Sequence, residues 1–135
     1  MTVYVETNFV LELSLQQEEC DVCAGIIKLA SQGLIVLAVP AFSLAEPHVA
    51  IVGKEKARTQ LSRDLRSQLR DLGRSKPHRA LPASFDALAG VLAASAQSER
   101  DGVRDTVSDI LGAADVISLD SNILKQPSIS RWSLA

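Results

Sequence analysis

Residues 3–13 read VYVETNFVLEL, an apolar run that is interrupted by Glu6, Thr7 and Asn8 and then continues. Its first three residues belong to types that favour extended strands, so a short β-strand is predicted there. Thr7 or Asn8 can cap a helix over residues 9–14, because each offers a side-chain oxygen to a free backbone N–H. The stretch therefore predicts a strand that ends at a carboxylate, with a helix beginning just behind it.

The rest of the chain alternates between predicted helices and strands. Residues 18–32 have the apolar spacing of a helix that ends at Gly33, and residues 34–39 form a continuous apolar run. Such a run is typical of a parallel strand that helices cover on both faces. Three further helices and one strand are expected at 54–72, 84–96, 101–111 and 115–119. We therefore expect a single domain over residues 1–135, with an α/β fold around a central parallel sheet.

A second helical region begins after Pro40 and contains Pro47. Proline has no backbone N–H, and its ring clashes with the carbonyl group one turn earlier. We therefore expect this helix to break or kink near Ala45 and Glu46.

Basic residues are concentrated in residues 54–79, although the net charge of the whole chain is only −2. This segment holds nine of the 14 Lys and Arg residues, against three acids. If the segment is helical, with about 100° per residue, four arginines lie roughly opposite its leucines. These arginines are Arg63, Arg66, Arg70 and Arg74. Two interpretations stay open: a surface for RNA phosphates, or a solvated face that pairs locally with Asp64 and Asp71.

Glu6 and Glu46 are the candidates for a shared site. Each follows a predicted parallel strand, and the carboxyl ends of such strands meet at one edge of a sheet, where ligands bind. Two converging carboxylates either share a proton or hold a hard cation, and oxygen ligands favour Mg²⁺ or Mn²⁺. In the alternative interpretation Glu6 only begins a helix, where the helix dipole favours an acid.

The stretch VYVETNFVLEL, together with AVPAFSLAEP at residues 38–47, resembles the PIN-domain family of metal-dependent nucleases, in particular its bacterial PIN-like branch. The resemblance implies a three-layer α/β/α sandwich around a parallel sheet. It also implies acidic residues that bind Mg²⁺ or Mn²⁺ for hydrolysis of RNA phosphodiester bonds. Glu6 and Glu46 match the first two of these acids. Thr7 or Asn8 matches the small polar position that orients the first acid or the water, which makes Asn8 a candidate catalytic residue.

The sequence departs from the family's pattern at its acidic residues. Glu6 stands where the family usually has Asp, and the extra methylene moves the carboxylate by about 1.5 Å. On one alignment residues 116–135 precede the family's third motif, so that the third and fourth acids and the last strand are absent and the domain is C-terminally truncated. An alternative register uses Asp86, Asp115 and Asp120, with Asp120 as a metal ligand after the strand VISL. Its gap from Asp86 to Asp120 is long for the single helix expected between them.

These features predict a Mg²⁺- or Mn²⁺-dependent ribonuclease, and the resemblance extends this to a toxin-like role with an antitoxin-like protein partner. A missing strand would leave an open sheet edge, which predicts a homo-oligomer. The alternative is a catalytically inactive PIN-like module that binds RNA or a protein.

Location and redox state are predicted from what the sequence contains. No apolar stretch approaches the roughly 20 residues of a membrane span, and the N-terminus lacks the basic region of a secretory signal. We therefore expect a cytoplasmic protein without membrane association, in which Cys20 and Cys23 are reduced and partly buried.

Overall fold

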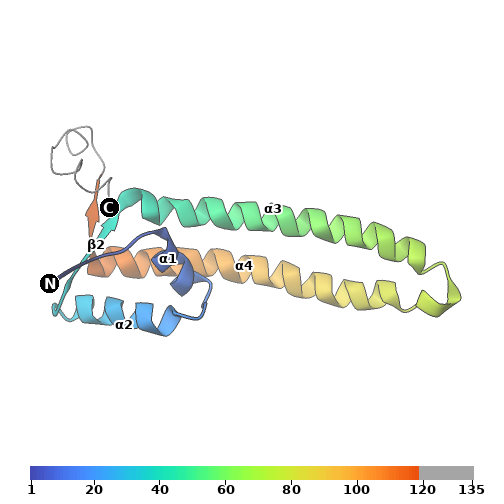
Figure 1. Cartoon of the computed structure of the whole chain (residues 1–135), viewed down its shortest axis with the longest axis horizontal. Coiled ribbons are helices and arrows are strands. Elements are labelled where there is room, and N and C mark those ends of the chain that lie inside the picture. The colour runs from blue at the N-terminus through green and yellow to red at the C-terminus, as the bar shows by residue number, and fades with distance from the viewer. Residues whose placement is uncertain (119–135) are drawn as a thin grey trace, which may run out of the picture.

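The computed structural model describes residues 1–118, which contain four α-helices and a three-stranded sheet. The helices are α1 (Thr7–Ser14), α2 (Cys20–Ser31), α3 (Ala41–Leu72) and α4 (Leu81–Ala113), and a 3-10 turn, η1 (Lys76–His78), joins the last two. The strands are β1 (Thr2–Tyr4), β2 (Val36–Pro40) and β3 (Ala114–Ile117). Figure 1 shows that α3 and α4 form a long antiparallel hairpin, which extends well past the sheet and the two short helices.

The sheet is parallel throughout, and β2 is its central strand. Its register places Tyr4 of β1 and Asp115 of β3 opposite Ala38 of β2. Leu37, Ala38 and Val39 are all buried, which means that both faces of β2 are covered. The continuous apolar run therefore forms the covered parallel strand that the sequence predicts.

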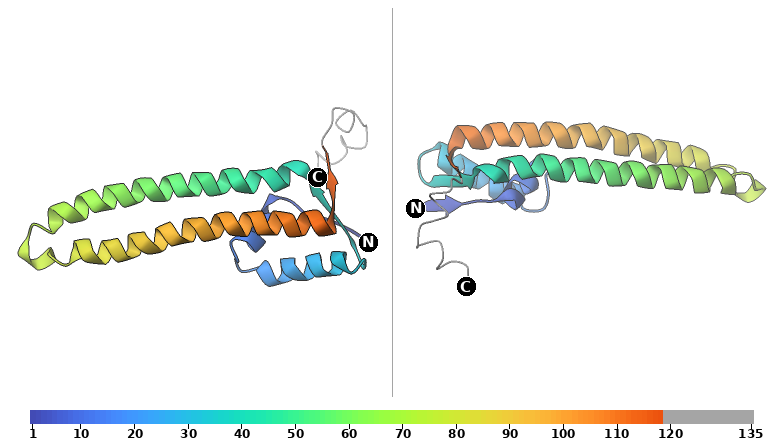
Figure 2. Two further views of the ribbon diagram at one scale, coloured as in Figure 1. Left: turned by 180° about the vertical axis from the view of Figure 1, so that it is seen from behind. Right: turned by 90° about the horizontal axis from the view of Figure 1, so that it is seen from above.

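The hydrophobic core lies at the sheet end of the molecule. It contains five buried residues, contributed by the chain around β1, by β2, and by the inner sides of two helices: Val5, Val10, Leu37, Val39 and Ile110. Helix α1 packs against both α3 and α4, and α2 packs against α1, α4 and β2. The core therefore fixes the two ends of the hairpin that join the sheet, while the outer part of the hairpin extends away from it (Figure 2).

The ends of the short helices are set by local sequence, although not everywhere as predicted. Helix α1 begins two residues earlier than expected, and Glu6 rather than Thr7 or Asn8 is its N-cap residue, without a side-chain capping bond. Helix α2 ends where Gly33 adopts a φ of 72°. There the Gly33 N–H donates to the Ala30 carbonyl and the Leu34 N–H donates to the Leu29 carbonyl, a Schellman motif that favours glycine.

Helix α3 runs through Pro47 without a break, so of the two predicted outcomes near Ala45 and Glu46, a break or a kink, the break is wrong. Pro47 lacks the N–H that would reach the Ser43 carbonyl, which costs the helix one hydrogen bond. The Pro47 side chain is fully buried, and burial of its ring offsets part of that cost. Packing at the base of the hairpin therefore overrides the local preference of proline.

Helix α4 is continuous from Leu81 to Ala113, where the sequence predicts two helices separated near residues 97–100. The residues at this place include no proline or glycine, and two of them are held by α3. Glu99 accepts two hydrogen bonds from Arg58 at 2.9 Å, and Arg100 donates two to Glu55 at 2.5 Å. These cross-helix ion pairs stabilise the helix across the expected boundary.

The predicted three-layer α/β/α sandwich is wrong. Helices make up 75% of the described structure, and the three strands form only a small sheet. The physical reason is that residues 41–113 are used for two long helices that pack mainly on each other, instead of several short ones that cover a sheet. Among residues 1–118, none of the helices is long and apolar enough to cross a membrane.

Candidate functional site

Glu6 lies at the carboxyl end of β1, where the chain turns into α1. The Val5 N–H donates to the Ala38 carbonyl at 3.0 Å, which keeps the chain on the sheet up to the residue before Glu6. The Glu6 carbonyl then accepts from Phe9 and Val10 as the first bonds of the helix. The Glu6 side chain is exposed. The backbone therefore presents this carboxylate at the edge of the sheet.

Glu46 reaches the same edge from α3. Its Oε2 accepts a hydrogen bond from Thr7 Oγ1, which joins the first residue of α1 to the second turn of α3. The structure thus brings Glu46 to the residue next to Glu6. The resemblance implies that Thr7 or Asn8 orients the first acid or the water, and here Thr7 contacts the second acid. Asn8 is exposed in the first turn of α1.

The oxygen atoms at this edge suit a hydrated Mg²⁺ or Mn²⁺ ion. Two carboxylates, the Thr7 hydroxyl and the Asn8 amide lie on adjoining ends of α1 and α3, at an exposed surface. Mg²⁺ usually keeps several water molecules and is bound through one or two carboxylates, so this donor set fits it. Within residues 1–118 no three His, Cys, Asp or Glu side chains are grouped to hold a metal ion.

Within residues 1–118, the acids Asp86 and Asp115 of the alternative register are not grouped with Glu6 and Glu46 as metal ligands. Asp86 lies near the outer end of the hairpin, where it pairs with Arg66 at 3.5 Å. Asp115 is exposed within β3, beside Ala38. Asp120, the remaining predicted metal ligand, lies outside the described residues.

Ser43 is a feature of this region that the sequence pattern did not indicate. Its side chain is fully buried, and its Oγ has no hydrogen-bond partner. A buried hydroxyl in an apolar segment gives no periodic signal, because serine is equally common on exposed helix faces. Ser43 lies one turn before both Glu46 and Pro47, so it belongs to the packing that holds this part of α3.

Three of the four predicted RNA-binding arginines, Arg63, Arg66 and Arg70, lie on the outer half of α3, Arg74 lies just after its end, and all four are exposed. The local-pairing interpretation applies to some of them. Arg74 lies 3.9 Å from Asp71, and Arg66 pairs with Asp86 across the hairpin. Asp64 instead accepts a hydrogen bond from Gln60. In the described structure Arg63 and Arg70 form no ion pair, so two of the four charges are free for a ligand.

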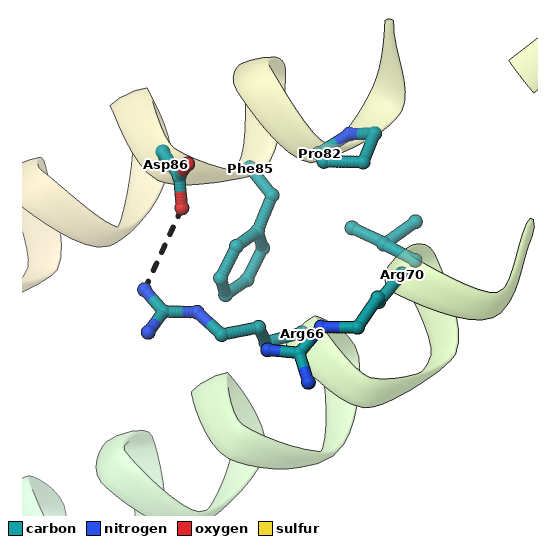
Figure 3. A pocket seen from close by; sticks show the side chains of 6 residues that line it. Arg66, Arg70, Pro82, Phe85 and Asp86 are labelled. Carbon is teal, nitrogen blue, oxygen red and sulfur yellow. Dashed lines mark ion pairs between the residues drawn. The ribbon is translucent and has the colours of Figure 1, made fainter. Parts of the chain in front are cut away.

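An open groove of about 450 Å³ lies beside these arginines, between the two helices (Figure 3). Arg66, Arg70, Pro82, Phe85 and Asp86 line it together with Leu69. The Arg66 guanidinium lies 5.6 Å from the centre of the Phe85 ring, within cation–π distance. Phe85 is buried, Arg66 contacts both Phe85 and Asp86, and Arg70 is exposed where it lines the groove.

The acid pair and the arginines do not form one site. Arg63 lies about 25 Å from Glu46 along the axis of α3, at about 1.5 Å per residue, and the other arginines are farther out. The sequence predicts Glu46 and these arginines in separate helical segments, whereas α3 is one continuous helix that carries both Glu46 and Arg63. The structure therefore has two separate candidate surfaces, one at the sheet edge and one on the outer hairpin.

The titrating groups with perturbed pKa values lie outside both surfaces. Hydrogen bonds from Arg100 lower the pKa of Glu55, and the same contact raises the pKa of Arg100. Burial and nearby acids raise the pKa values of Cys20 and Cys23, which are both free cysteines. These thiols are therefore protonated at neutral pH, as expected for cysteines without a catalytic role.

Comparison of the chain with protein-family models, with curated proteins and with solved structures found no match.

Proposed function

We propose that this chain is a Mg²⁺- or Mn²⁺-dependent ribonuclease whose cation binds at the sheet edge beside Glu6 and Glu46. The observation that carries the proposal is the hydrogen bond from Thr7 to Glu46, because it joins the second acid to the residue that follows the first. The PIN-like resemblance of the two motifs points to the same chemistry. The proposal does not depend on the sandwich architecture.

Glu6 and Glu46 would hold the cation, and Thr7 fixes the Glu46 side chain by occupying one of its oxygens. A bound Mg²⁺ or Mn²⁺ ion lowers the pKa of a coordinated water and stabilises charge on a phosphodiester. Asn8 lies in the first turn of α1, where its amide can hydrogen-bond to a phosphate oxygen or a water molecule.

The arginines on α3 would bind RNA phosphates away from the acids. Arg63 and Arg70 are exposed and form no ion pair among the described residues. Such contacts release counterions, so they add affinity that depends strongly on salt. A substrate that contacts both surfaces must span about 25 Å, which favours a folded or long RNA over a short oligonucleotide.

Cleavage of a long single-stranded RNA by the purified protein in Mn²⁺ tests the proposal. We expect cleavage by the wild type and its loss in both Glu6→Gln and Glu46→Gln. Glu18→Gln is the matched control, because Glu18 is an exposed acid in the turn before α2. Activity that survives both site substitutions would contradict the assignment.

A second candidate function is RNA binding without catalysis. It is favoured by the observation that the described residues group fewer than three metal-ligand side chains, while the hairpin carries a separate basic surface. Replacing Arg63, Arg66, Arg70 and Arg74 with Gln distinguishes the two functions. For a catalytically inactive module, RNA binding falls and its salt slope drops by about 0.7 per arginine–phosphate contact, while cleavage is absent from the start. Lys28→Gln, on the exposed side of α2, is the control.

A further inference from the structure

The outer half of the hairpin exposes leucines from both helices. We define the leucine strip as Leu61, Leu65 and Leu72 of α3 with Leu88 and Leu92 of α4. Their side chains are between 36% and 65% exposed. Single exposed leucines are normal on protein surfaces, but a contiguous group marks an interaction site.

Helix geometry places the five leucines on one face of the hairpin. The side of α3 that faces α4 lies near Ser62 and Leu69. At about 100° per residue, the α3 leucines are rotated roughly 50–90° away from this side. Leu88 and Leu92 are rotated roughly 40–80° in the same sense from the side of α4 that faces α3, near Phe85 and Ala89. Because the two helices are right-handed and antiparallel, rotation in the same sense brings both sets to the same face.

Two ion pairs confirm this assignment of faces. Arg58 and Glu99 are rotated toward the leucine side, and they meet at 2.9 Å. Arg66 and Asp86 are rotated the other way, and they also meet, beside the groove of Figure 3. The hairpin therefore has a leucine face and, on the other side of the seam between its helices, a basic face.

The leucine face is uncharged along its outer half. Between residues 61 and 95 its other side chains are neutral, namely Gln68, Leu81, Ser84 and Ser95. An uncharged strip cannot form ion pairs with a charged partner. Two such strips can pack against each other without burying any charge. The arginines of α3 lie on the opposite side of the hairpin, so they stay outside an interface that the strip forms.

We propose that a second copy of this chain covers the leucine strip, so that two hairpins form an antiparallel four-helix bundle. A two-fold axis through the strip places the same residues on both sides, which is how symmetric dimers bury a single apolar face. Four helices with short connections are a stable solution for helices that are apolar along one side. This interface lies on the hairpin and not at the sheet edge, and both basic faces stay exposed in the dimer.

Sedimentation equilibrium of the full chain, without RNA or added metal, tests the dimer independently of the proposed ribonuclease function. We expect the mass to double across the micromolar range. Leu65→Glu combined with Leu88→Glu should raise the dissociation constant of the dimer at least tenfold, because each copy then carries two charges in the interface. The control Val22→Glu, at an equally exposed position on α2, should leave the mass unchanged.

Two variants with opposite charges at the same positions distinguish loss of the interface from loss of folding. The Leu65→Glu, Leu88→Glu chain should pair with a Leu65→Lys, Leu88→Lys chain when the two are mixed, although each alone stays monomeric. A wild type that remains monomeric overturns the proposal, as does a dimer that the double substitution leaves intact. A monomer that sediments instead with anionic phospholipid vesicles assigns the strip to a membrane surface and overturns it as well.

Discussion

Thr7 is the residue on which the geometry of the sheet edge most directly depends. Its hydroxyl donates to Glu46, and hydrogen bonds to a charged group contribute roughly 1.5–3 kcal/mol when they are well formed, less at an exposed site such as this. Thr7→Val keeps the shape of the side chain and removes the donor. We expect Mn²⁺, titrated by calorimetry, to bind about three- to tenfold more weakly to this variant, corresponding to roughly 0.7–1.4 kcal/mol.

Thr7→Ser keeps the hydroxyl and serves as the matched variant, with an affinity close to that of the wild type. Equal Mn²⁺ affinity in Thr7→Val and the wild type would show that the position of Glu46 does not depend on Thr7.

Gly102 is required by the close approach of two helices. A Cβ atom at this position would meet the backbone carbonyl of Ser14, at the end of α1, and a backbone atom cannot move aside as a flexible side chain can. We expect Gly102→Ala to destabilise the protein by about 1–3 kcal/mol, in the range found for overpacked cores. Urea denaturation followed by circular dichroism measures the change.

Gly112→Ala is the control for Gly102→Ala, because it lies in the same helix with open space around its Cβ position. This change should stabilise the protein by about 0.5–1 kcal/mol through the higher helix propensity of alanine. A similar response at both positions would mean that α1 moves away from α4 at little cost.

At the scale of the elements, two ion pairs hold the hairpin together beyond the core. Glu55 pairs with Arg100 and Arg58 pairs with Glu99, in reciprocal positions on the facing helices. The hydrogen bonds from Arg100 lower the pKa of Glu55 below its ordinary value of 4.5. A carboxyl group with a lowered pKa in the folded state stabilises the fold above its ordinary pKa and loses this contribution as the pH falls through the lowered value.

We therefore expect the free energy of unfolding to fall below pH 4.5 in the wild type, partly because Glu55 is protonated. Glu55→Gln should lower the free energy of unfolding at pH 7. It should also make the free energy of unfolding less dependent on pH below pH 4.5. Urea denaturation at a series of pH values measures both effects. Asp109→Asn, an exposed acid on α4, is the control, and an identical acid dependence in Glu55→Gln and the wild type would contradict the assignment.

The lengths of the helices show which features of an element can be predicted from sequence. The end of α2 is predictable, because Gly33 adopts a backbone conformation that side chains disfavour. The continuity of α3 through Pro47, by contrast, depends on buried packing that involves other parts of the chain. Local propensity fixes the end of a helix where a single residue determines it. Tertiary contacts determine whether two predicted helical segments form one continuous helix.

The same distinction applies to the candidate site. That Glu6 and Glu46 approach the same edge follows from a general property of parallel strands, once β1 and β2 are parallel neighbours. That Thr7 bonds to Glu46, and that Ser43 is buried beside it, depends on how α1 docks on α3. The separation of the arginines from the acids likewise depends on a continuous α3, whereas the local effect of Pro47 predicts a break or kink.

At the scale of the whole molecule, the sheet end and the outer hairpin differ in what stabilises them. The buried cluster of Val5, Val10, Leu37, Val39 and Ile110 lies at the sheet end. The outer hairpin has Phe85 as its large buried side chain, and several of its leucines are exposed. The sheet end therefore has the core of a small domain. The outer hairpin projects from this core, and the core does not depend on the hairpin for its stability.

This division predicts that the hairpin can be shortened without unfolding the protein. Replacing residues 62–92 with a short Gly-Ser linker joins the helices just beyond the Arg58–Glu99 pair and leaves the whole core in place. We expect this variant to unfold cooperatively in urea, with a smaller m-value because less surface becomes exposed. It should keep its Mn²⁺ affinity and lose its salt-dependent RNA binding, because the acids stay at the sheet edge while Arg63, Arg66 and Arg70 are removed. A shortened chain without a cooperative transition would show that the outer hairpin stabilises the sheet, and RNA binding that is unchanged would place the basic surface elsewhere.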